Sequence, residues 1–308
     1  MRTGSINVRI MSRILDLLKF YGLRIILRQK IPLLASFKLT YRCNLRCSGC
    51  PFHLRAQEDN AQLTWEQALA GLQALKLKGA RIIVFEGGEP LLWRDGPHSF
   101  NDLVLHAKKL FTTVAVTTNG TLPLDVPTDI LWVSLDGLPE THDRLRSGSF
   151  EQIWQNLKTA THPRTFVHFT INSENWRDLE GLLEMLREVP VVRGVTVQLF
   201  YPYGQGEAPL ALSPEERRAA VENALRLQKK YPLLNSRRSL AAMIDNKWRC
   251  HDDILINVDP DGHITQGCYA RDRGRICCHD CGFTPVAEAS GAIDLSFGSL
   301  VAGARIFL

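Results

Sequence analysis

The sequence predicts an α/β fold: a partial (β/α)6 barrel of the TIM type with a small C-terminal extension. Three observations predict it. Six short apolar runs have the composition of buried strands, helical segments alternate with them, and from about residue 235 this rhythm gives way to cysteines, glycines and short runs. The alternation implies parallel strands joined by right-handed crossovers. Because six units are too few to close an eight-stranded barrel, we expect an open, partial one.

The expected strands are rich in Val, Ile, Phe and Thr. They cover residues 34–40, 81–86, 113–118, 130–136, 165–172 and 194–200. In barrels of this kind the chemistry gathers at the carboxyl ends of the strands. Residues that directly follow these six runs are therefore the first candidates for a functional site.

The expected helices show apolar residues at helical spacing. They cover residues 8–30, 64–78, 99–110, 150–160, 176–189 and 213–231. The last begins with Ser213, Pro214 and two glutamates, a good helix-start signal. Three parts follow: a basic amphipathic helix within 1–33, the barrel over 34–234 and the extension over 235–308.

Composition indicates a globular chain with metal-binding cysteines. The 308 residues carry a net charge of +5, with 45% hydrophobic and 22% charged residues. Eight cysteines form two groups, three near residue 47 and five within 250–281. No signal peptide and no run of about 18 uncharged apolar residues is present. Clustered cysteines in a chain expected to be cytoplasmic predict metal rather than disulfides.

The first cysteine group follows the first expected strand. Cys43, Cys47 and Cys50 lie in "CNLRCSGC", with the spacing C-x3-C-x2-C. Zinc sites and complete iron–sulfur sites normally have four protein ligands. Three interpretations remain open: a zinc site completed by His53, three unconnected thiols, or a cubane cluster whose fourth iron is open to a small molecule.

Four further motifs decide between these interpretations. "EGGEP" (86–90), "TTNGT" (117–121) and "VSLDG" (133–137) follow the second, third and fourth strands, and "ETHDRLRSGSF" covers 140–150. Together with "CNLRCSGC" they resemble, in order, the motifs of the radical S-adenosylmethionine (SAM) superfamily over about residues 35–200. The resemblance implies an enzyme that binds SAM at the open iron of a [4Fe–4S] cluster. Reductive cleavage of SAM then gives a 5′-deoxyadenosyl radical, which abstracts hydrogen from a substrate.

The resemblance also implies which residues serve the site. Cys43, Cys47 and Cys50 would hold the cluster, and the expected SAM contacts are Gly87, Gly88, Glu89, Pro90, Asn119, Ser134 and Asp136. Asn119 is equally compatible with a turn role, and Ser134 and Asp136 with capping of a strand. Arg144 would either meet the SAM carboxylate or lie on the surface.

One position departs from the family pattern. Gly49 stands where the family often has an aromatic residue next to the adenine. Phe52, two residues after Cys50, is the expected substitute.

The second cysteine group has the layout C-x17-C-x8-C-C-x2-C, and "NVDPDGHITQGC" (257–268) predicts a hairpin within it. The group resembles the SPASM and Twitch extensions of radical SAM enzymes. Five cysteines complete one auxiliary [4Fe–4S] cluster, so two [4Fe–4S] clusters are expected in all. The expected ligands are Cys250, Cys268, Cys278 and Cys281. Cys277 would be spare, and a zinc site with His251 or His279 is the alternative.

The basic segment 8–30 has two interpretations, a helix that caps the bottom of the barrel or one that lies on an anionic membrane. We expect a cytoplasmic protein, peripheral at the inner membrane surface if the second holds. No nucleic acid is expected as a partner.

The expected substrate is a lipid or small apolar molecule, and the expected reductant is a small protein such as flavodoxin or ferredoxin. A peptide-modifying enzyme is the alternative, although the 34 or so residues before the barrel are few for a leader-binding domain. A non-catalytic iron–sulfur sensor or electron carrier is the alternative of another class.

Overall fold

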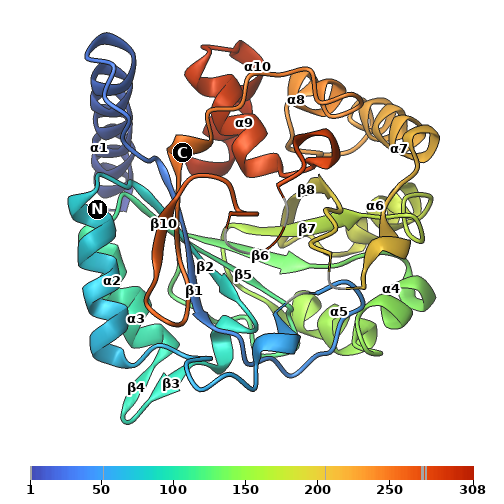
Figure 1. Cartoon of the computed structure of the whole chain (residues 1–308), viewed down its shortest axis with the longest axis horizontal. Coiled ribbons are helices and arrows are strands. Elements are labelled where there is room, and N and C mark those ends of the chain that lie inside the picture. The colour runs from blue at the N-terminus through green and yellow to red at the C-terminus, as the bar shows by residue number, and fades with distance from the viewer. Residues whose placement is uncertain (1, 51, 205, 272–273, 275) are drawn as a thin grey trace.

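The structure is a computed structural model that describes residues 2–50, 52–204, 206–271, 274 and 276–308. The side chains of residues 2–10 and 12 are not described. One mostly parallel sheet forms the centre, and helices surround it (Figure 1).

Eight strands form this sheet, in the order β10-β9-β1-β2-β5-β6-β7-β8. Their bounds are Leu34–Thr40 (β1), Ile82–Gly87 (β2), Thr113–Thr118 (β5), Ile130–Ser134 (β6), Thr165–Ile171 (β7), Val192–Leu199 (β8), Leu255–Val258 (β9) and Ile264–Gln266 (β10). All six predicted strands are present and parallel, which confirms the α/β partial barrel.

The predicted C-terminal hairpin also forms, as β9 and β10. It does not stand apart from the barrel. β9 pairs in parallel with β1, with Leu34 opposite Leu255 and Phe37 opposite Val258. The second cysteine group is therefore attached to the strand that leads into the first.

Helices cover the outer face of the sheet. They are α1 (Arg2–Tyr21), α2 (Trp65–Leu77), α3 (Phe100–Leu110), α4 (Pro139–Leu145), α5 (Phe150–Thr159), α6 (Leu179–Met185), α7 (Pro214–Leu227), α8 (Arg237–Ala242), α9 (Thr284–Ile293) and α10 (Phe297–Phe307). A short hairpin, β3 (Arg94–Asp95) and β4 (His98–Ser99), precedes α3. Capping boxes at Thr64, Ser99 and Ser213 begin α2, α3 and α7.

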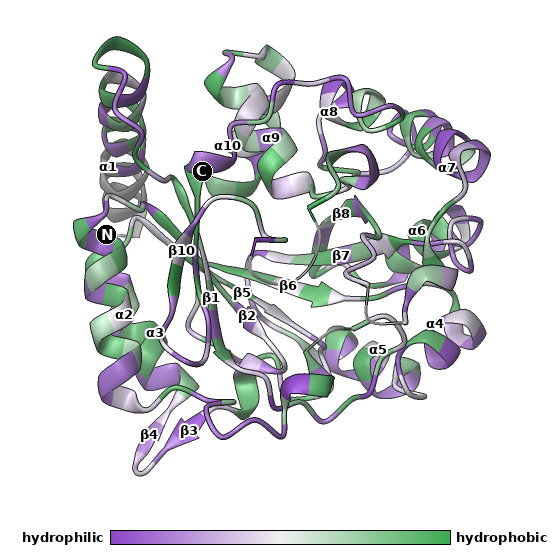
Figure 2. Ribbon diagram, viewed as in Figure 1, coloured by the Kyte–Doolittle hydropathy of each residue, from purple (hydrophilic) through white to green (hydrophobic). Residues whose placement is uncertain are grey.

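Side chains alternate along each strand between an outer apolar layer and the barrel interior. The hydropathy colours show the strands as largely apolar (Figure 2). An inner cluster contains Ala115, Ile130, Trp132, Phe166, Leu234 and Ile306. Phe307 of α10 packs on it, with its ring centroid 6.2 Å from that of Trp132. The C-terminal helix, which the sequence analysis did not predict, thus fills the amino end of the barrel.

The N-terminal helix lies against the same end of the barrel. Its residue Phe20 is fully buried, Asp16 forms an ion pair with Arg81 at 3.0 Å, and Arg13 forms one with Asp129 at 3.2 Å. These contacts show that one face of α1 packs on the barrel, and the helix continues into a π-helical turn over Gly22–Ile26. Among the described residues, no helix is long and apolar enough to cross a bilayer.

Candidate functional site

The three cysteines lie in the loop that leaves the carboxyl end of β1, where the sequence analysis expected them. A cavity of about 480 Å³ adjoins the loop, lined on one side by Cys47, Gly49 and Cys50 and on the other by Glu207 and Leu210. The loop is thus accessible from one side, as a site that must admit a small molecule requires.

The thiols of this loop lie within electrostatic reach of one another. Burial raises the pKa of Cys43, and it raises that of Cys47 to about 11. Neighbouring thiolates, including that of Cys50, oppose ionisation further. Three adjacent thiols of this kind match the donor set of an iron–sulfur cluster, because the metal replaces their protons when it binds.

The sulfur of Cys43 receives polar contacts of the kind that support cluster ligands. The backbone N–H of Leu45 donates to its Sγ at 3.4 Å, and Nδ2 of Asn119 approaches it at 3.6 Å. Hydrogen bonds to the ligating sulfur stabilise the thiolate and help set a cluster's potential. The residues therefore fit the predicted cluster.

A buried arginine that the sequence analysis did not select lies beside the loop. Nε of Arg146 is 2.6 Å from Oδ2 of Asp136, whose Oδ1 accepts from the backbone N–H of Thr170 at 2.7 Å. Burial raises the pKa of Cys47, and the positive charge of Arg146 counteracts part of this increase. Arg144 is instead half-exposed and pairs with two exposed glutamates, which matches its surface interpretation.

Glu89 of "EGGEP" joins the ends of two strands. It is fully buried, and its carboxylate accepts from Thr118 Oγ1 at 2.8 Å, from the N–H of Asn119 at 2.7 Å and from the N–H of Leu91 at 3.0 Å. Burial raises its pKa, against these three donors. Glu89 therefore acts in this structure as a tie between loops.

The two glycines of that motif permit close contact with the cysteine loop. Gly87 has φ +127°, and a Cβ there would lie 2.5 Å from the carbonyl oxygen of Thr40. A Cβ on Gly88 would overlap the carbonyl of Arg42. Gly88 and the following residue also donate to these two carbonyls. In this structure, therefore, the two glycines make room for the backbone of the cysteine loop itself.

The remaining predicted SAM contacts lie at the same edge of the sheet. Asn119 uses its side chain within the loops, with Nδ2 donating to Asn44 at 2.8 Å and Oδ1 accepting from the N–H and hydroxyl of Thr121. Ser134 is buried at the end of β6. Pro90 begins a 3-10 turn directly after Glu89. These contacts assign Asn119 a clear positioning role for the loop that carries Cys43.

Packing accounts for Gly49. Its φ is +78°, and a Cβ would lie 2.7 Å from Leu210 and 2.9 Å from the ring of Phe200. An aromatic side chain does not fit there, and Phe200, just beyond β8, occupies that side of the loop. Phe52, the expected substitute, stacks on Tyr41 with ring centroids 5.7 Å apart.

The barrel interior near this edge is polar. Lys38, fully buried on β1, forms an ion pair with Glu86 of β2 at 3.2 Å. Its Nζ lies 6.0 Å from the ring of Phe52 and 5.9 Å from that of Tyr269, which follows the auxiliary Cys268. The sequence signal that could have identified Lys38 was the alternation of polar Ser36, Lys38 and Thr40 with apolar residues along β1. Lys38 thus contacts residues from both cysteine segments.

Four of the five C-terminal cysteines also lie within electrostatic reach of one another. Burial raises the pKa of Cys250 to about 12 and that of Cys281 to about 11, and nearby thiolates, including those of Cys268 and Cys278, raise both further. Cys277 has contacts of its own: its N–H donates to the hydroxyl of Tyr201, and its thiol donates to the Asp280 carboxylate.

This grouping contains the four cysteines predicted as auxiliary ligands. Among the described residues, no three Cys, His, Asp or Glu side chains converge on a single metal ion. A four-iron cluster does not require its ligands to converge on one ion, because each thiolate binds a separate iron.

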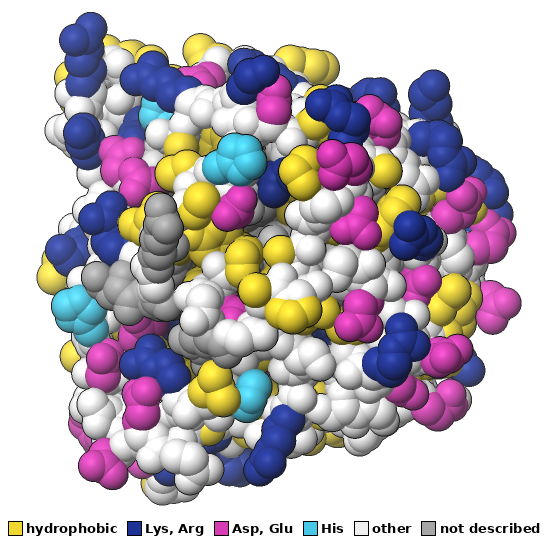
Figure 3. All heavy atoms as spheres, turned by 45° about the vertical axis from the view of Figure 1, so that its right-hand side comes forward, with side chains coloured by type: hydrophobic (Ala, Val, Ile, Leu, Met, Phe, Trp, Pro, Cys, Tyr) yellow, Lys and Arg dark blue, Asp and Glu magenta, His cyan; other side chains and the backbone are white. Residues whose placement is uncertain are grey.

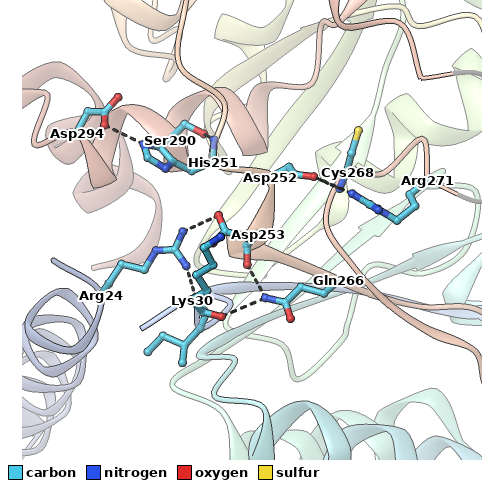
Figure 4. A network of polar contacts seen from close by, with 11 residues as sticks. Arg24, Lys30, His251, Asp252, Asp253, Gln266, Cys268, Arg271, Ser290 and Asp294 are labelled. Atoms are coloured by element: carbon cyan, nitrogen blue, oxygen red, sulfur yellow. Dashed lines mark hydrogen bonds and ion pairs between the residues drawn. The ribbon is translucent and has the colours of Figure 1, made fainter. Parts of the chain in front are cut away.

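Polar contacts fix the auxiliary segment to the barrel and to the N-terminal region (Figure 4). Asp252 accepts from the N–H of Cys268 at 3.3 Å, and Asp253 pairs with Arg24 at 2.6 Å. Nε2 of Gln266 bridges the carbonyls of Lys30 and Asp253. The segments that carry Cys250 and Cys268 are thereby fixed to the residues that precede β1.

Known proteins match the chain in sequence. Fe-coproporphyrin III synthase of Methanosarcina barkeri is 31% identical over 208 residues, covering 63% of this chain and 51% of that protein. The sporulation killing factor maturation protein SkfB of Bacillus subtilis is 30% identical over 166 residues, covering 50% and 39%. The chain thus spans about half of these relatives or less. AdoMet-dependent heme synthase of M. barkeri is 26% identical, covering 83% and 78%.

Solved structures match it in fold. Streptococcus suis SuiB bound to the precursor peptide SuiA superposes with a TM-score of 0.63 at 14% identity, covering 90% of this chain and 67% of SuiB. The sequence profile of the Radical SAM superfamily matches residues 37–186, the segment that carries the three loop cysteines and the four motifs after the strands. The chain belongs to the radical SAM superfamily.

Proposed function

We propose that the chain is an enzyme that cleaves SAM reductively at a [4Fe–4S] cluster held by Cys43, Cys47 and Cys50. When bound, the cluster supplies the electron that splits SAM into methionine and a 5′-deoxyadenosyl radical, which takes a hydrogen atom from the substrate. The observation that carries the proposal is the grouping of three partly buried thiols with two N–H donors to Cys43, next to a cavity of about 480 Å³.

In this proposal the surrounding residues hold the loop and balance its charge. Glu89 and Asn119 tie the loops after β2 and β5 to the cysteine loop. Arg146 offsets the negative charge of the thiolates, and Asp136 fixes its position. The proposed neighbours of SAM remain Gly87, Gly88, Pro90 and Ser134, with Phe52 and Phe200 as the candidate aromatic neighbours of its adenine.

The test is anaerobic reconstitution with iron and sulfide, followed by reduction with dithionite in the presence of SAM. Release of 5′-deoxyadenosine is expected from the wild type. It should be absent from Cys43→Ala and unchanged in Cys277→Ala. SAM cleavage by the Cys43→Ala variant would contradict the cluster assignment, and no cleavage by the intact chain would favour an iron–sulfur carrier.

We propose a second [4Fe–4S] cluster on Cys250, Cys268, Cys278 and Cys281. It is supported by their mutual electrostatic effects and by the separate contacts of Cys277. With four thiolate ligands such a cluster transfers electrons rather than binding substrate. It would accept one electron from the substrate radical, which loses a proton at the same stage, so that the substrate is dehydrogenated overall.

For the substrate, a small and largely apolar molecule remains the proposal, and a tetrapyrrole is the class that the relatives favour. The match to AdoMet-dependent heme synthase covers 83% of the chain, more than the predicted barrel alone. Stimulation of 5′-deoxyadenosine release by iron coproporphyrin III, with a product of altered mass, would support it. A peptide substrate is the second candidate, favoured by the similarity to SkfB. No stimulation by the tetrapyrrole would leave that candidate in first place.

We propose that α1 attaches the protein to an anionic membrane through its outer face. Met11, Leu15 and Leu18, spaced by four and three residues, are 58%, 59% and 62% exposed on the side opposite Phe20. Lys19 and Lys30 are also exposed nearby in the sequence, and the one acidic residue of this segment, Asp16, is paired with Arg81. An apolar face with basic neighbours and no free acid fits an anionic lipid surface.

On the face drawn in Figure 3, Lys and Arg alternate with Asp and Glu. Exposed ion pairs such as Arg226 with Glu180 link α7 to α6.

A small protein reductant such as flavodoxin or ferredoxin remains the proposed electron donor.

A further inference from the structure

One arginine reaches the auxiliary cysteines from outside their own segment. Arg217 lies in the first turn of α7. Its Nη2 donates to the carbonyl of Cys281 at 2.5 Å, its Nη1 to the carbonyl of Asp280 at 3.3 Å, and its Nε to the carbonyl of Met243 at 2.6 Å. The guanidinium therefore ties the turn that ends in Cys281 to the end of α8.

The charge of Arg217 is not balanced by a carboxylate partner. Its hydrogen-bond partners are backbone carbonyls, and no carboxylate of the described residues forms an ion pair with it. Arg146, the corresponding arginine at the first cysteine group, has a carboxylate partner, Asp136, at 2.6 Å. A partly buried cation is costly without a counter-charge. Among the neighbouring charges, the thiolate of Cys281 acts on Arg217 most strongly, ahead of the carboxylate of Asp280, and can provide one.

We propose that Arg217 is a positioning residue of the auxiliary cluster and its counter-charge. This inference rests on the proposed second cluster. A [4Fe–4S] cluster with four thiolates is negatively charged in both oxidation states and gains one more negative charge on reduction. A fixed cation beside one ligand stabilises the reduced state more than the oxidised state. Arg217 therefore raises the cluster's potential, which favours the transfer of an electron from the substrate radical to the auxiliary cluster.

The experiment isolates this cluster in the full-length chain. In a parent with Cys43, Cys47 and Cys50 all replaced by alanine, only the auxiliary site can assemble. After anaerobic reconstitution, iron and sulfide are counted, and the midpoint potential is measured by a redox titration followed by EPR. Arg217→Gln removes the positive charge, and Arg217→Lys keeps the charge but loses the several N–H donors of the guanidinium. Arg218→Gln, at the exposed neighbouring position, is the matched control.

At the midpoint of the parent, we expect Arg217→Gln to lower the ratio of reduced to oxidised cluster by threefold to tenfold. A tenfold change corresponds to 59 mV for one electron. Arg218→Gln should match the parent, and Arg217→Lys should fall within threefold of it. A full iron content with the parent's midpoint in Arg217→Gln would overturn the inference while leaving the second cluster intact.

The remaining outcomes also decide. If Arg217→Gln fails to assemble a cluster, Arg217→Lys takes its place. A midpoint potential of Arg217→Lys near that of the parent then supports the role of Arg217 as a counter-charge. Failure of both variants to assemble a cluster would show that Arg217 only anchors the structure, and would overturn the counter-charge role. A parent that takes up no iron, or that binds zinc instead, would overturn the proposed auxiliary cluster itself.

Discussion

The guanidinium of Arg146 lies 2.6 Å from the carboxylate of Asp136, and this pair lies within electrostatic reach of Cys47 in the cysteine loop. Both side chains are largely buried. Arg146→Met should lower the free energy of unfolding by about 3–5 kcal/mol, because it leaves the Asp136 carboxylate buried and unpaired. It should also reduce iron uptake at the first site, since Cys47 loses the charge that favours its thiolate. Thermal unfolding and iron content measure the two effects.

The matched control is Arg144→Met, two residues earlier in the same segment, where the side chain is 53% exposed. Exposed ion pairs contribute little, so this variant should behave like the wild type. Equal behaviour of the two variants would show that Arg146 does not have the role assigned to it.

His142 makes the stability of the site region depend on pH. It is fully buried, its Nδ1 accepts from the N–H of Asp136 at 3.1 Å, and burial lowers its pKa to about 4 from an ordinary 6.5. Between pH 7.5 and 5.5 the unfolded chain therefore binds a proton that the folded chain does not. Stability should fall over this range by roughly 1.4 kcal/mol from His142 alone.

This contribution is measured as the difference between wild type and His142→Gln in unfolding free energy across that range. The variant should be less stable at pH 7.5 and should lose less stability on acidification. His263→Asn, at an exposed position in the turn between β9 and β10, is the control and should keep the wild-type slope. A wild-type slope in His142→Gln would refute the assignment.

The adjacent cysteines Cys277 and Cys278 should differ in their effect on iron content. Cys278 contributes to the electrostatic grouping of the auxiliary thiols, whereas Cys277 contacts Tyr201 and Asp280. Cys278→Ala should lower the reconstituted iron from about eight to about four per chain, and Cys277→Ala should leave it unchanged. Iron analysis and EPR give the answer directly, and the reverse result would exchange the two assignments.

The outer face of α1 predicts binding to anionic vesicles. Leu15→Glu with Leu18→Glu should reduce co-sedimentation with phosphatidylserine-containing vesicles at least tenfold, because both substitutions place a charge on the exposed apolar face. Binding by the wild type should also weaken as salt is raised. Leu77→Glu on α2, where the leucine is 79% exposed, is the matched control and should sediment like the wild type. Equal recovery of all three proteins would remove the membrane proposal.

Most of the barrel could be predicted because its strands carry strong local signals. The six runs are short, apolar and β-branched, and their observed bounds agree with the expected ones to within two residues. The C-terminal helices α9 and α10 were missed because their sequence is rich in glycine, alanine and serine, which gives weak helical periodicity. Ile306 and Phe307 show why these helices form: they are stabilised by packing into the amino end of the barrel.

The reactive groups of this protein can be identified from its local sequence. The spacing of Cys43, Cys47 and Cys50 and the order of the motifs after the strands identify the family without coordinates, because strand ends meet at one edge whatever the details of packing. Tertiary structure decided which neighbours serve those groups. Only the folded chain distinguishes Arg146 from Arg144 and places Arg217 beside Cys281, since burial and long-range contacts set the energy of a charge and leave no local mark in the sequence.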